Sequence, residues 1–299
     1  MSSIRFWAED VLRSAIIEEV PLKGGMSTAL SVVTTQSGRQ AVLRQYPTPK
    51  WSSQRARRAA TDEALVLVAL VDTDVPAPTL LGVTADRKDV APALLTSLCL
   101  GSRHRGRDLG VAGELGGVLA GIHSVRPVAG LSDETTATVE SLRAGRPPRY
   151  GAPSALLELV MQSVPKELAT RPRVLVHNDF SVSNVLVDGD RFTGVVDWTE
   201  AGTGNAGADV GFAYVSTVLS FGSLAGEEFL QGYRSRGVSP VDDLGWWTLL
   251  AASRLEPDID SWTGSANFLG PADLTTAQVR KRFNGLVETA TASVQVSAR

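Results

Sequence analysis

Three polar residues at the ends of short apolar runs form the most informative pattern in this chain. Asp179 closely follows one apolar run, Asn184 begins the next, and Asp197 ends a third. Runs of this length that are rich in β-branched residues predict short strands, and the turn signal at Asp188–Asp190 predicts a hairpin. A hairpin there is expected to bring Asn184 and Asp197 close together. The pattern therefore predicts two carboxylates and one amide that converge at one rim.

These residue types match the needs of phosphoryl transfer. The reaction requires a carboxylate that orients the attacking hydroxyl and accepts its proton, and oxygen ligands that hold magnesium against the phosphates. Magnesium prefers carboxylate and amide oxygens to nitrogen or sulfur. Asp179, Asn184 and Asp197 supply that set. Each residue alone is better explained as a turn cap or a strand end, and only the set of three indicates a site.

The segment His177-Asn178-Asp179, with Asn184 five positions later and Asp197-Trp198 after the next run, resembles a known family. It is similar to the loop of the aminoglycoside phosphotransferase and choline-kinase-like family, a branch of the protein-kinase-like fold. The resemblance implies that Asp179 is the catalytic carboxylate and that Asn184 and Asp197 are metal ligands. It also implies ATP or GTP and Mg²⁺ as cofactors.

The same resemblance assigns supporting roles around the loop. His177 begins the loop motif, and Asp209 resembles the acid that braces the catalytic loop in the family. Residues 120–123 resemble the family's Leu-His helix end, so His123 is expected to be structural. The chain departs from the family pattern at Asn178, where the family has glycine, and at Ser181, where it has a second histidine.

A glycine-containing segment at residues 24–27 resembles the nucleotide-positioning loop of the family, whose backbone faces phosphate oxygens. Alone, such a Gly-Gly turn is more often only a turn. Arg44 lies on the strand where protein kinases place a lysine for the α- and β-phosphates, and Glu63 matches its acidic partner. Arginine keeps the charge of lysine but differs in shape and donor geometry, and the alternative for Arg44 is a solvent-facing strand residue. The expected nucleotide-binding residues are Gly24, Gly25, Ser27, Arg44, Glu63 and Ser97.

The elements expected to position these residues divide the chain into a strand-rich front and a helix-rich back. In the front, helices are expected at 6–20 and 52–71, and strands at 29–35, 40–46, 79–83 and 92–98. In the back, helices are expected at 109–125, 155–168, 208–219, 226–233, 244–255 and 275–289. Together with the resemblance, this order predicts an α+β, two-lobed protein-kinase-like fold. The small, mainly antiparallel N-lobe at 1–98 is expected to bind the nucleotide, and the larger, mainly helical C-lobe at 99–299 to carry catalysis and the substrate.

Composition and charge exclude several other classes of protein. The chain has 299 residues and a net charge of −3, so it lacks the basic excess of a nucleic-acid binder. The local cluster of Arg55, Arg57 and Arg58 is expected to be a solvated helix face. Cys99 is the single cysteine and the three histidines are widely spaced, so neither an intrachain disulfide nor a zinc site is expected.

The sequence also lacks the signals of export and membrane insertion. No run reaches the roughly 18 apolar residues of a membrane span, and Met1–Glu9 does not resemble a signal peptide. We therefore expect a cytoplasmic protein, monomeric or homodimeric, whose partner is a small-molecule substrate rather than a nucleic acid or a membrane.

The acceptor is expected to bind over the helical part, beside Asp179. Acidic residues in loops suit aminated substrates such as aminoglycosides or choline, although a solvated loop explains them as well. The segment Asp197–Ala201 also resembles macrolide phosphotransferases. Four aromatic residues either line a pocket for a larger apolar ligand or, as we favour, belong to the core: Trp246, Trp247, Trp262 and Phe268. The acidic candidates for substrate binding are Glu200, Glu256, Asp258 and Asp260.

The prediction is therefore a nucleotide-dependent O-phosphotransferase that acts on a hydroxyl of a small molecule, foremost an antibiotic such as an aminoglycoside or a macrolide. Three alternatives stay open. One is a metabolic or biosynthetic kinase for choline, an amino sugar or a natural product. Another is a nucleotide-binding scaffold that has lost catalysis. The third, a metal-dependent hydrolase, lacks the histidine-rich ligand set usual in such sites.

Overall fold

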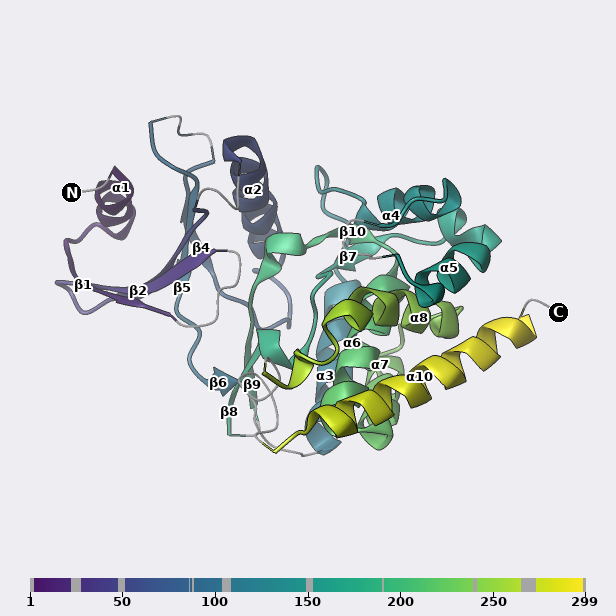
Figure 1. Ribbon diagram of the computed structural model, residues 1–299. Helices are drawn as coiled ribbons and strands as arrows, with labels where there is room; N and C mark the ends of the chain where they lie inside the picture. The colour runs from purple at the N-terminus through teal and green to yellow at the C-terminus, as the bar shows by residue number, and fades with distance from the viewer. Residues whose placement is uncertain are drawn as a thin grey trace. The chain divides into compact units, whose positions relative to one another are not determined.

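A computed structural model describes residues 3–22, 28–47, 52–85, 87, 89–103, 109–148, 153–189, 191–238, 241–264 and 273–297 (Figure 1). The chain divides into two compact units. The N-terminal unit comprises residues 1–101 together with the distant segment 193–200, and the C-terminal unit comprises residues 102–192 and 201–299. The predicted catalytic and metal residues are thus distributed over both units, because Asp197 belongs to the first while Asp179 and Asn184 belong to the second.

The N-terminal unit is built on an antiparallel five-stranded sheet with the order β1-β2-β3-β5-β4. The four predicted strands are confirmed, with ends that differ by no more than one residue, and a fifth strand was not expected. Gly38, whose φ of 81° suits a tight turn, joins β2 to β3. The strands are β1 (Ile16–Pro21), β2 (Ala29–Thr35), β3 (Gln40–Gln45), β4 (Leu80–Val83) and β5 (Ala93–Ser97).

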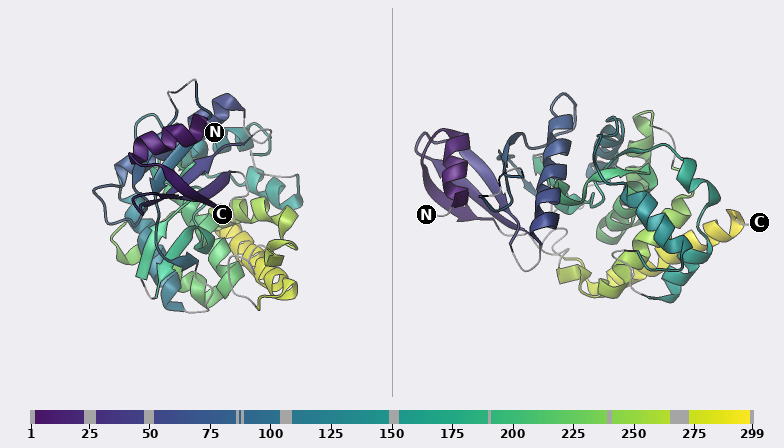
Figure 2. Two further views of the ribbon diagram at one scale, coloured as in Figure 1. Left: turned by 90° about the vertical axis from the view of Figure 1, so that its left-hand side faces the viewer. Right: turned by 90° about the horizontal axis from the view of Figure 1, so that it is seen from above.

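Two helices, α1 (Ser3–Leu12) and α2 (Ser53–Ala69), cover opposite faces of this sheet (Figure 2). Side chains alternate between the faces of a strand, and β3 follows this rule. Ala41 and Leu43 join the apolar cluster that contains α1, whereas Tyr46 packs with the alanines of α2. Alternation therefore places Arg44 on the α2 face, which is the face of Glu63.

The predicted helix at 6–20 is wrong beyond Leu12. The chain leaves the helix through Arg13, whose φ is 53°, and Ile16–Pro21 then pairs with β2. The carboxylate of Glu9 accepts a hydrogen bond from the backbone amide of Ile16 at 2.9 Å, which fixes the turn between helix and strand. The apolar spacing continued across this turn, but pairing with a neighbouring strand decided the structure of the β-branched segment.

The C-terminal unit is mainly helical. Its largest apolar cluster joins α4, α5, α6, α8 and α10, and it contains the buried rings of Trp246 and Trp247, as predicted. Trp262 packs against the same cluster, whereas Phe268 lies outside the described residues. The helices are α3 (Leu109–His123), α4 (Glu134–Arg143), α5 (Ala155–Gln162), α6 (Ala206–Phe221), α7 (Ser223–Ser235), α8 (Leu244–Leu255) and α10 (Thr276–Ser297).

Three helices in this unit differ from prediction, and one of them, predicted at 275–289, continues to Ser297. Helix α4 was not expected, because few of its residues are apolar; Asp133 caps it by accepting from the amide of Thr136 at 2.8 Å. The helix predicted at 155–168 ends at Gln162. Pro165 disfavours helical backbone at the residue before it, and the chain continues as a short 3₁₀ helix, η1 (Lys166–Thr170).

Short strands frame the segment with the predicted catalytic residue. β7 (Val174–Val176) leads into His177 and pairs antiparallel with β10 (Gly202–Gly204), which was not predicted. A separate sheet has the order β6 (Ser102–Arg103), β8 (Val185–Asp188) and β9 (Arg191–Val195). No helix within the described part of the chain is both long and apolar enough to cross a membrane.

The basic cluster on α2 is only partly the solvated face that was predicted. Arg55 and Arg58 are exposed, but Arg57 donates hydrogen bonds to several carbonyl oxygens of the β4–β5 connection. The guanidinium of Arg57 therefore holds this connection against α2, and its role is structural.

Candidate active site

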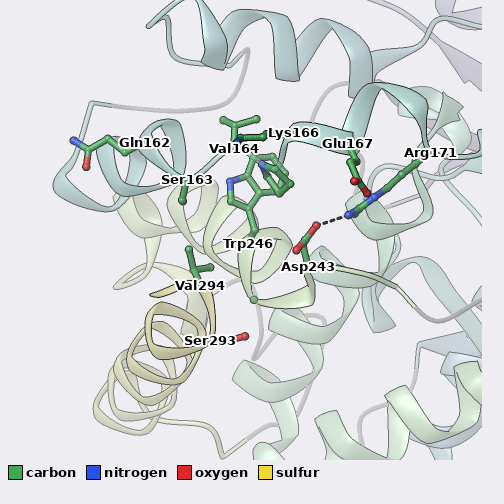
Figure 3. Close-up of a pocket in the computed structure, with 12 residues that line it drawn as sticks. Gln162, Ser163, Val164, Lys166, Glu167, Arg171, Asp243, Trp246, Ser293 and Val294 are labelled. Atoms are coloured by element: carbon green, nitrogen blue, oxygen red, sulfur yellow. Dashed lines mark hydrogen bonds and ion pairs between the residues drawn. The ribbon is translucent and has the colours of Figure 1, made fainter. Parts of the chain in front are cut away.

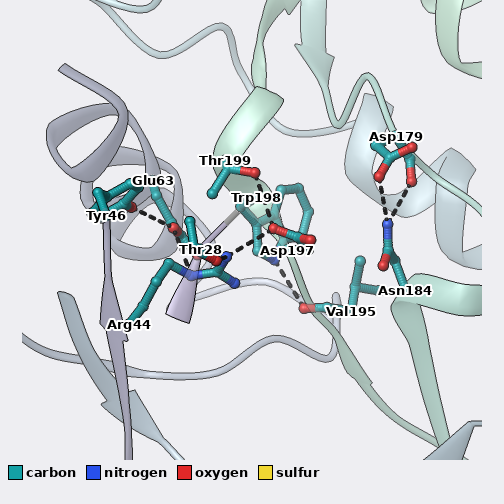
Figure 4. Close-up of polar contacts among 10 residues, drawn as sticks. All are labelled: Thr28, Arg44, Tyr46, Glu63, Asp179, Asn184, Val195, Asp197, Trp198 and Thr199. Atoms are coloured by element: carbon teal, nitrogen blue, oxygen red, sulfur yellow. Dashed lines mark hydrogen bonds and ion pairs between the residues drawn. The ribbon is translucent and has the colours of Figure 1, made fainter. Parts of the chain in front are cut away.

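Arg44 lies at the centre of a buried polar cluster in the N-terminal unit (Figure 4). Its side chain is buried, with 7% of the residue exposed, so the alternative of a solvent-facing arginine is wrong. Arg44 Nε lies 3.3 Å from Glu63 Oε2, and Nη1 lies 2.9 Å from Asp197 Oδ1. The same Nη1 donates to Thr28 Oγ1 at 3.0 Å. One guanidinium thus joins α2, the segment 193–200 and the residue that precedes β2.

The charges in this cluster support one another. Burial alone would lower the pKa of the Arg44 guanidinium, but attraction by Glu63 and Asp197 outweighs it, and the pKa lies above its ordinary value. Arg44 is therefore a cation throughout the working pH range. Tyr46 donates to Glu63 Oε2 at 3.1 Å, and burial, followed by the charge of Glu63, raises the pKa of this phenol. The phenol therefore keeps its proton and serves as a donor.

Asp197 is held in an unusual backbone conformation. Its φ is 68°, a left-handed value that only glycine adopts freely. Thr199 Oγ1 donates to Asp197 Oδ1 at 2.9 Å, the same oxygen that Arg44 contacts. The neighbouring Trp198 is fully buried and donates from Nε1 to the carbonyl of Val195 at 2.9 Å. These contacts fix the orientation of the carboxylate within the N-terminal unit.

Asp179 and Asn184 meet in the C-terminal unit, on the loop after β7. Asn184 Nδ2 donates to Asp179 Oδ2 and to the carbonyl oxygen of Asp179, each at 2.9 Å. The 3₁₀ turn η2 (Val182–Asn184) shortens the loop enough for this contact between residues five positions apart. Because a carboxylate only accepts, the amide nitrogen must face Asp179, which leaves the amide oxygen of Asn184 as an acceptor for another group.

Asp209, in the first turn of α6, binds the backbone of the loop that carries Asp179. The residue is fully buried, and its two carboxylate oxygens accept from the backbone amides of His177 and Asn178, each at 2.6 Å. His177 is also fully buried, and its Nδ1 accepts from the amide of Asp179 at 3.3 Å. The structure thus places both predicted supporting residues, His177 and Asp209, in direct contact with the loop.

The conformation of Asn178 explains why this chain tolerates a departure from glycine. Asn178 has a φ of 63°, in the left-handed region. Glycine adopts this region without steric cost, and asparagine is among the residues that enter it most readily. Asparagine therefore suits the left-handed backbone that the chain adopts at this position of the loop.

Several other predicted residues have simple placements. Gly24, Gly25 and Ser27 lie outside the described residues. Ser97 Oγ accepts from the amide of Thr79 at 2.8 Å, and the amide of Ser97 donates to the carbonyl of Thr79 at 2.8 Å. The hydroxyl of Ser97 therefore already accepts a hydrogen bond from the backbone beside the end of β5.

The four acidic candidates for substrate binding belong to different units of the chain. Glu200 was expected in the helical part, but it lies in η3 (Trp198–Glu200) of the N-terminal unit. Glu256 and Asp258 lie in η4 (Glu256–Asp258), and Asp260 forms an ion pair with Arg280. Only the predicted placement of Glu200 in the helical part is wrong, because its segment, 193–200, packs with the sheet unit.

A cavity of about 540 Å³ lies among α5, η1, α8 and α10 and contains none of the predicted site residues (Figure 3). An ion pair between Arg171 and Asp243 stands at one side, and Trp246 forms part of the wall. Within the described residues, no group of three or more His, Cys, Asp or Glu side chains is arranged to hold a metal ion.

Sequence reasoning missed three members of the Arg44 cluster, namely Thr28, Tyr46 and Thr199. Tyr46 had a usable signal, because a residue two positions after Arg44 shares its face of the strand. Thr28 and Thr199 had none, since their contacts depend on how distant segments pack.

The sequence model of a phosphotransferase enzyme family (APH) matches residues 18–245. No curated protein matches the sequence. Among solved structures, macrolide 2'-phosphotransferase MphH from Brachybacterium faecium is similar, with a TM-score of 0.61, 20% identity and coverage of 95% of this chain and 96% of its own.

Two further structures show the same similarity. A thermostable mutant of aminoglycoside phosphotransferase APH(4)-Ia, in complex with AMP-PNP and hygromycin B, has a TM-score of 0.62 at 17% identity, covering 96% of this chain and 98% of its own. A choline/ethanolamine kinase family protein from Mesorhizobium loti has a TM-score of 0.58 at 17% identity, covering 93% and 92%. These similarities confirm the predicted α+β, protein-kinase-like fold.

Proposed function

This chain belongs to the phosphotransferase enzyme family and is a small-molecule kinase, and on that premise we propose that it transfers the γ-phosphate of ATP to a hydroxyl of a macrolide or aminoglycoside antibiotic. The observation that carries the proposal is the hydrogen-bonded pair of Asp179 and Asn184. The amide nitrogen of Asn184 donates to the carboxylate of Asp179, so the amide oxygen of Asn184 points away from that carboxylate. The loop thus offers a positioned base and a hard oxygen ligand five residues apart.

In this proposal Asp179 accepts the proton of the attacking hydroxyl. A general base must reach the acceptor, and Asp179 is partly exposed, whereas His177 before it and Phe180 after it are buried. Asn184 holds Oδ2, and Asp209 holds the backbone on which Asp179 stands. Orientation of this kind, rather than covalent chemistry, supplies most of the catalysis in phosphoryl transfer.

The proposed magnesium ligands are Asn184, through its amide oxygen, and Asp197, through its carboxylate. Their oxygen donors suit Mg²⁺, and Mg²⁺ bound together with nucleotide phosphates takes only one or two protein ligands. The proposal therefore does not require a cluster of acidic and histidine side chains. When bound, the ion neutralises charge on the phosphates.

Arg44 is the proposed phosphate-orienting cation, and Glu63 holds its side chain. The proposed nucleotide contacts of Gly24, Gly25, Ser27 and Ser97 complete the donor site. The pairing of Arg44 with Glu63 also argues against an inactive scaffold, because the substitution of lysine by arginine has kept the buried ion pair. The reaction is proposed to take place in the cytoplasm, where nucleoside triphosphates are available.

The proposed acceptor class is supported by the antibiotic kinases among the structural neighbours and by the resemblance of Asp197–Ala201 to macrolide phosphotransferases. Glu200, Glu256, Asp258 and Asp260 stay in the proposal as candidate contacts for an aminated acceptor. A second candidate function is phosphorylation of choline or a related amino alcohol, because a choline/ethanolamine kinase family protein has the same fold.

The test is a coupled nucleotide-consumption assay with magnesium against macrolides, aminoglycosides, choline and amino sugars. We expect turnover with one antibiotic class and a loss of at least about 100-fold in kcat for Asp179→Ala. Asp188→Ala is the matched control, because this aspartate is exposed at the end of β8. Turnover with choline alone would establish the second candidate, and full activity of Asp179→Ala would exclude the proposed mechanism.

A further inference from the structure

Asp209 receives a hydrogen bond beyond the two that hold the loop. His123, at the end of α3, places Nε2 3.2 Å from Asp209 Oδ2. On the other side of the same ring, Nδ1 lies 2.8 Å from the hydroxyl of Tyr233 on α7. Tyr233 is 2% exposed and His123 is 6% exposed, so solvent does not compete for these contacts. A buried chain therefore runs from Tyr233 through His123 to Asp209.

The chemistry of the three groups sets the direction of the hydrogen bonds. The Asp209 carboxylate accepts from two backbone amides, so it also accepts from His123, and Nε2 must carry a proton. In the neutral ring, Nδ1 is then the acceptor, and Tyr233 is the donor. Burial, followed by the charge of Asp209, raises the pKa of Tyr233, so the phenol keeps the proton that it donates. In this arrangement every polar side-chain atom of Tyr233, His123 and Asp209 has a hydrogen-bond partner.

Close packing of two helices holds the tyrosine in place. A Cβ atom on Gly116 of α3 would lie 2.0 Å from the carbonyl oxygen of Phe229, and one on Gly232 of α7 would lie 1.9 Å from that of Gly113. The backbones of α3 and α7 therefore touch directly, as only glycine permits. This contact fixes the position of Tyr233 relative to His123. The two rings meet edge-on, with their centroids 5.5 Å apart.

We propose that Tyr233 is a positioning residue for the loop that carries Asp179, acting through His123 and Asp209. The hydroxyl adds to the preference, already set by Asp209, for the ring form in which Nε2 donates, and the carboxylate that accepts this hydrogen bond also holds the amides of His177 and Asn178. Without the hydroxyl, Nδ1 loses its donor, and the competing ring form, in which Nδ1 is protonated and Nε2 turns a lone pair to the carboxylate, becomes less unfavourable. The inference rests on the proposed function, in which Asp179 is the catalytic carboxylate.

The first test uses the wild-type protein alone. Nitrogen NMR of histidine-labelled protein should show a protonated Nε2 and an unprotonated, hydrogen-bonded Nδ1 for His123. A protonated Nδ1 would overturn the proposal, whatever the protein's activity.

The second test is Tyr233→Phe, which removes a single oxygen atom. We expect the His123 signals to shift towards a mixture of ring forms, and kcat to fall about five- to tenfold with little change in KM for ATP, as for loss of one hydrogen bond. Tyr214→Phe, at a partly buried tyrosine on α6, is the control and should change neither. A folded Tyr233→Phe protein with wild-type signals and kcat would refute the role.

The outcomes separate this inference from the proposed function. Turnover that survives in Asp179→Ala would refute the proposed function and, with it, the catalytic consequence of Tyr233. An inactive Asp179→Ala protein together with an unaffected Tyr233→Phe protein would refute the inference alone.

Discussion

At the scale of single residues, the cation at position 44 shows how the local environment decides the role of a side chain. A guanidinium presents several donors in a rigid fork, so one arginine contacts Glu63, Asp197 and Thr28 together. The ammonium group of lysine carries the same charge on a single nitrogen, so it cannot reproduce the donor geometry of the guanidinium. The contacts of Arg44 therefore depend on its shape as well as on its charge.

Replacing Arg44 by methionine should strongly destabilise the N-terminal unit. The change leaves Glu63 buried without its cation, and removal of one partner of a buried ion pair costs about 3–5 kcal/mol. Denaturant unfolding followed by circular dichroism measures the change. Arg87→Met is the matched control, because the Arg87–Asp89 pair is exposed and should contribute nothing measurable. Equal losses in the two variants would contradict a buried role for Arg44.

At the scale of elements, the contact between α3 and α7 depends on glycine at particular positions. Gly116 has a backbone carbonyl where a Cβ atom would stand, whereas at Gly113 the nearest atom is 3.6 Å away. Two glycines on the same helix therefore have opposite tolerance for a methyl group. The difference arises from the neighbouring helix and not from α3 itself.

Gly116→Ala should destabilise the C-terminal unit by about 1–3 kcal/mol, because α7 must move to admit the methyl group. Gly113→Ala should be neutral or stabilising by up to about 1 kcal/mol, since alanine favours the helix and finds room. Thermal unfolding of both variants measures the contrast. A Gly116→Ala protein as stable as Gly113→Ala would show that the two helices are not packed this closely.

The start of α4 carries a pH-dependent contribution to stability. Burial alone would raise the pKa of Asp133, but hydrogen bonds from the amide of Thr136 and from Arg173 lower it below its ordinary 3.8. A carboxyl whose pKa is lowered by folding stabilises the protein above its unfolded pKa, and this contribution is lost as the pH falls through the folded value.

The corresponding prediction concerns Asp133→Asn. Asparagine caps helices well but cannot pair with Arg173 as an anion, so the variant should be less stable than the wild type at pH 7. The difference should shrink as the pH falls below about 4, where the wild-type carboxyl takes up its proton. Urea unfolding between pH 7 and pH 3 measures it, and a difference independent of pH would contradict the ionic part of the contact.

At the scale of the whole molecule, the chain returns to its N-terminal unit late in the sequence. Residues 193–200 pack with the sheet unit although the residues on both sides belong to the helical unit. This return carries Asp197 to Arg44 and Glu63 and the ring of Trp198 into a buried place. Each unit also has apolar clusters of its own, so each contributes its own core.

Asp197→Asn tests the proposed metal ligand through the response of the whole protein to nucleotide. ATP should raise the melting temperature of the wild type more with magnesium than with EDTA, because a ligand that binds only the folded state stabilises it. In the variant, this magnesium-dependent part should disappear. Asp188→Asn should behave like the wild type. A variant that keeps the full magnesium effect would show that Asp197 does not bind the ion.

The sequence by itself determined the family motif, most of the strands and helices, and the place of Asp179 and Asn184 on one short loop. These features are local: periodicity and turn residues act over a few positions, and Asp179 and Asn184 meet within one tight loop.

Only the tertiary structure decided the features that join distant segments. Arg44 and Asp197 are 153 positions apart, and His123 and Tyr233 are 110 apart. Tertiary structure also decided that Ile16–Pro21 is a strand, because this segment pairs with β2 although its apolar spacing is helical. It likewise placed Glu200 in the N-terminal unit. The physical reason is that such contacts depend on how completed elements pack, and neither spacing nor propensity along the chain encodes which faces will meet.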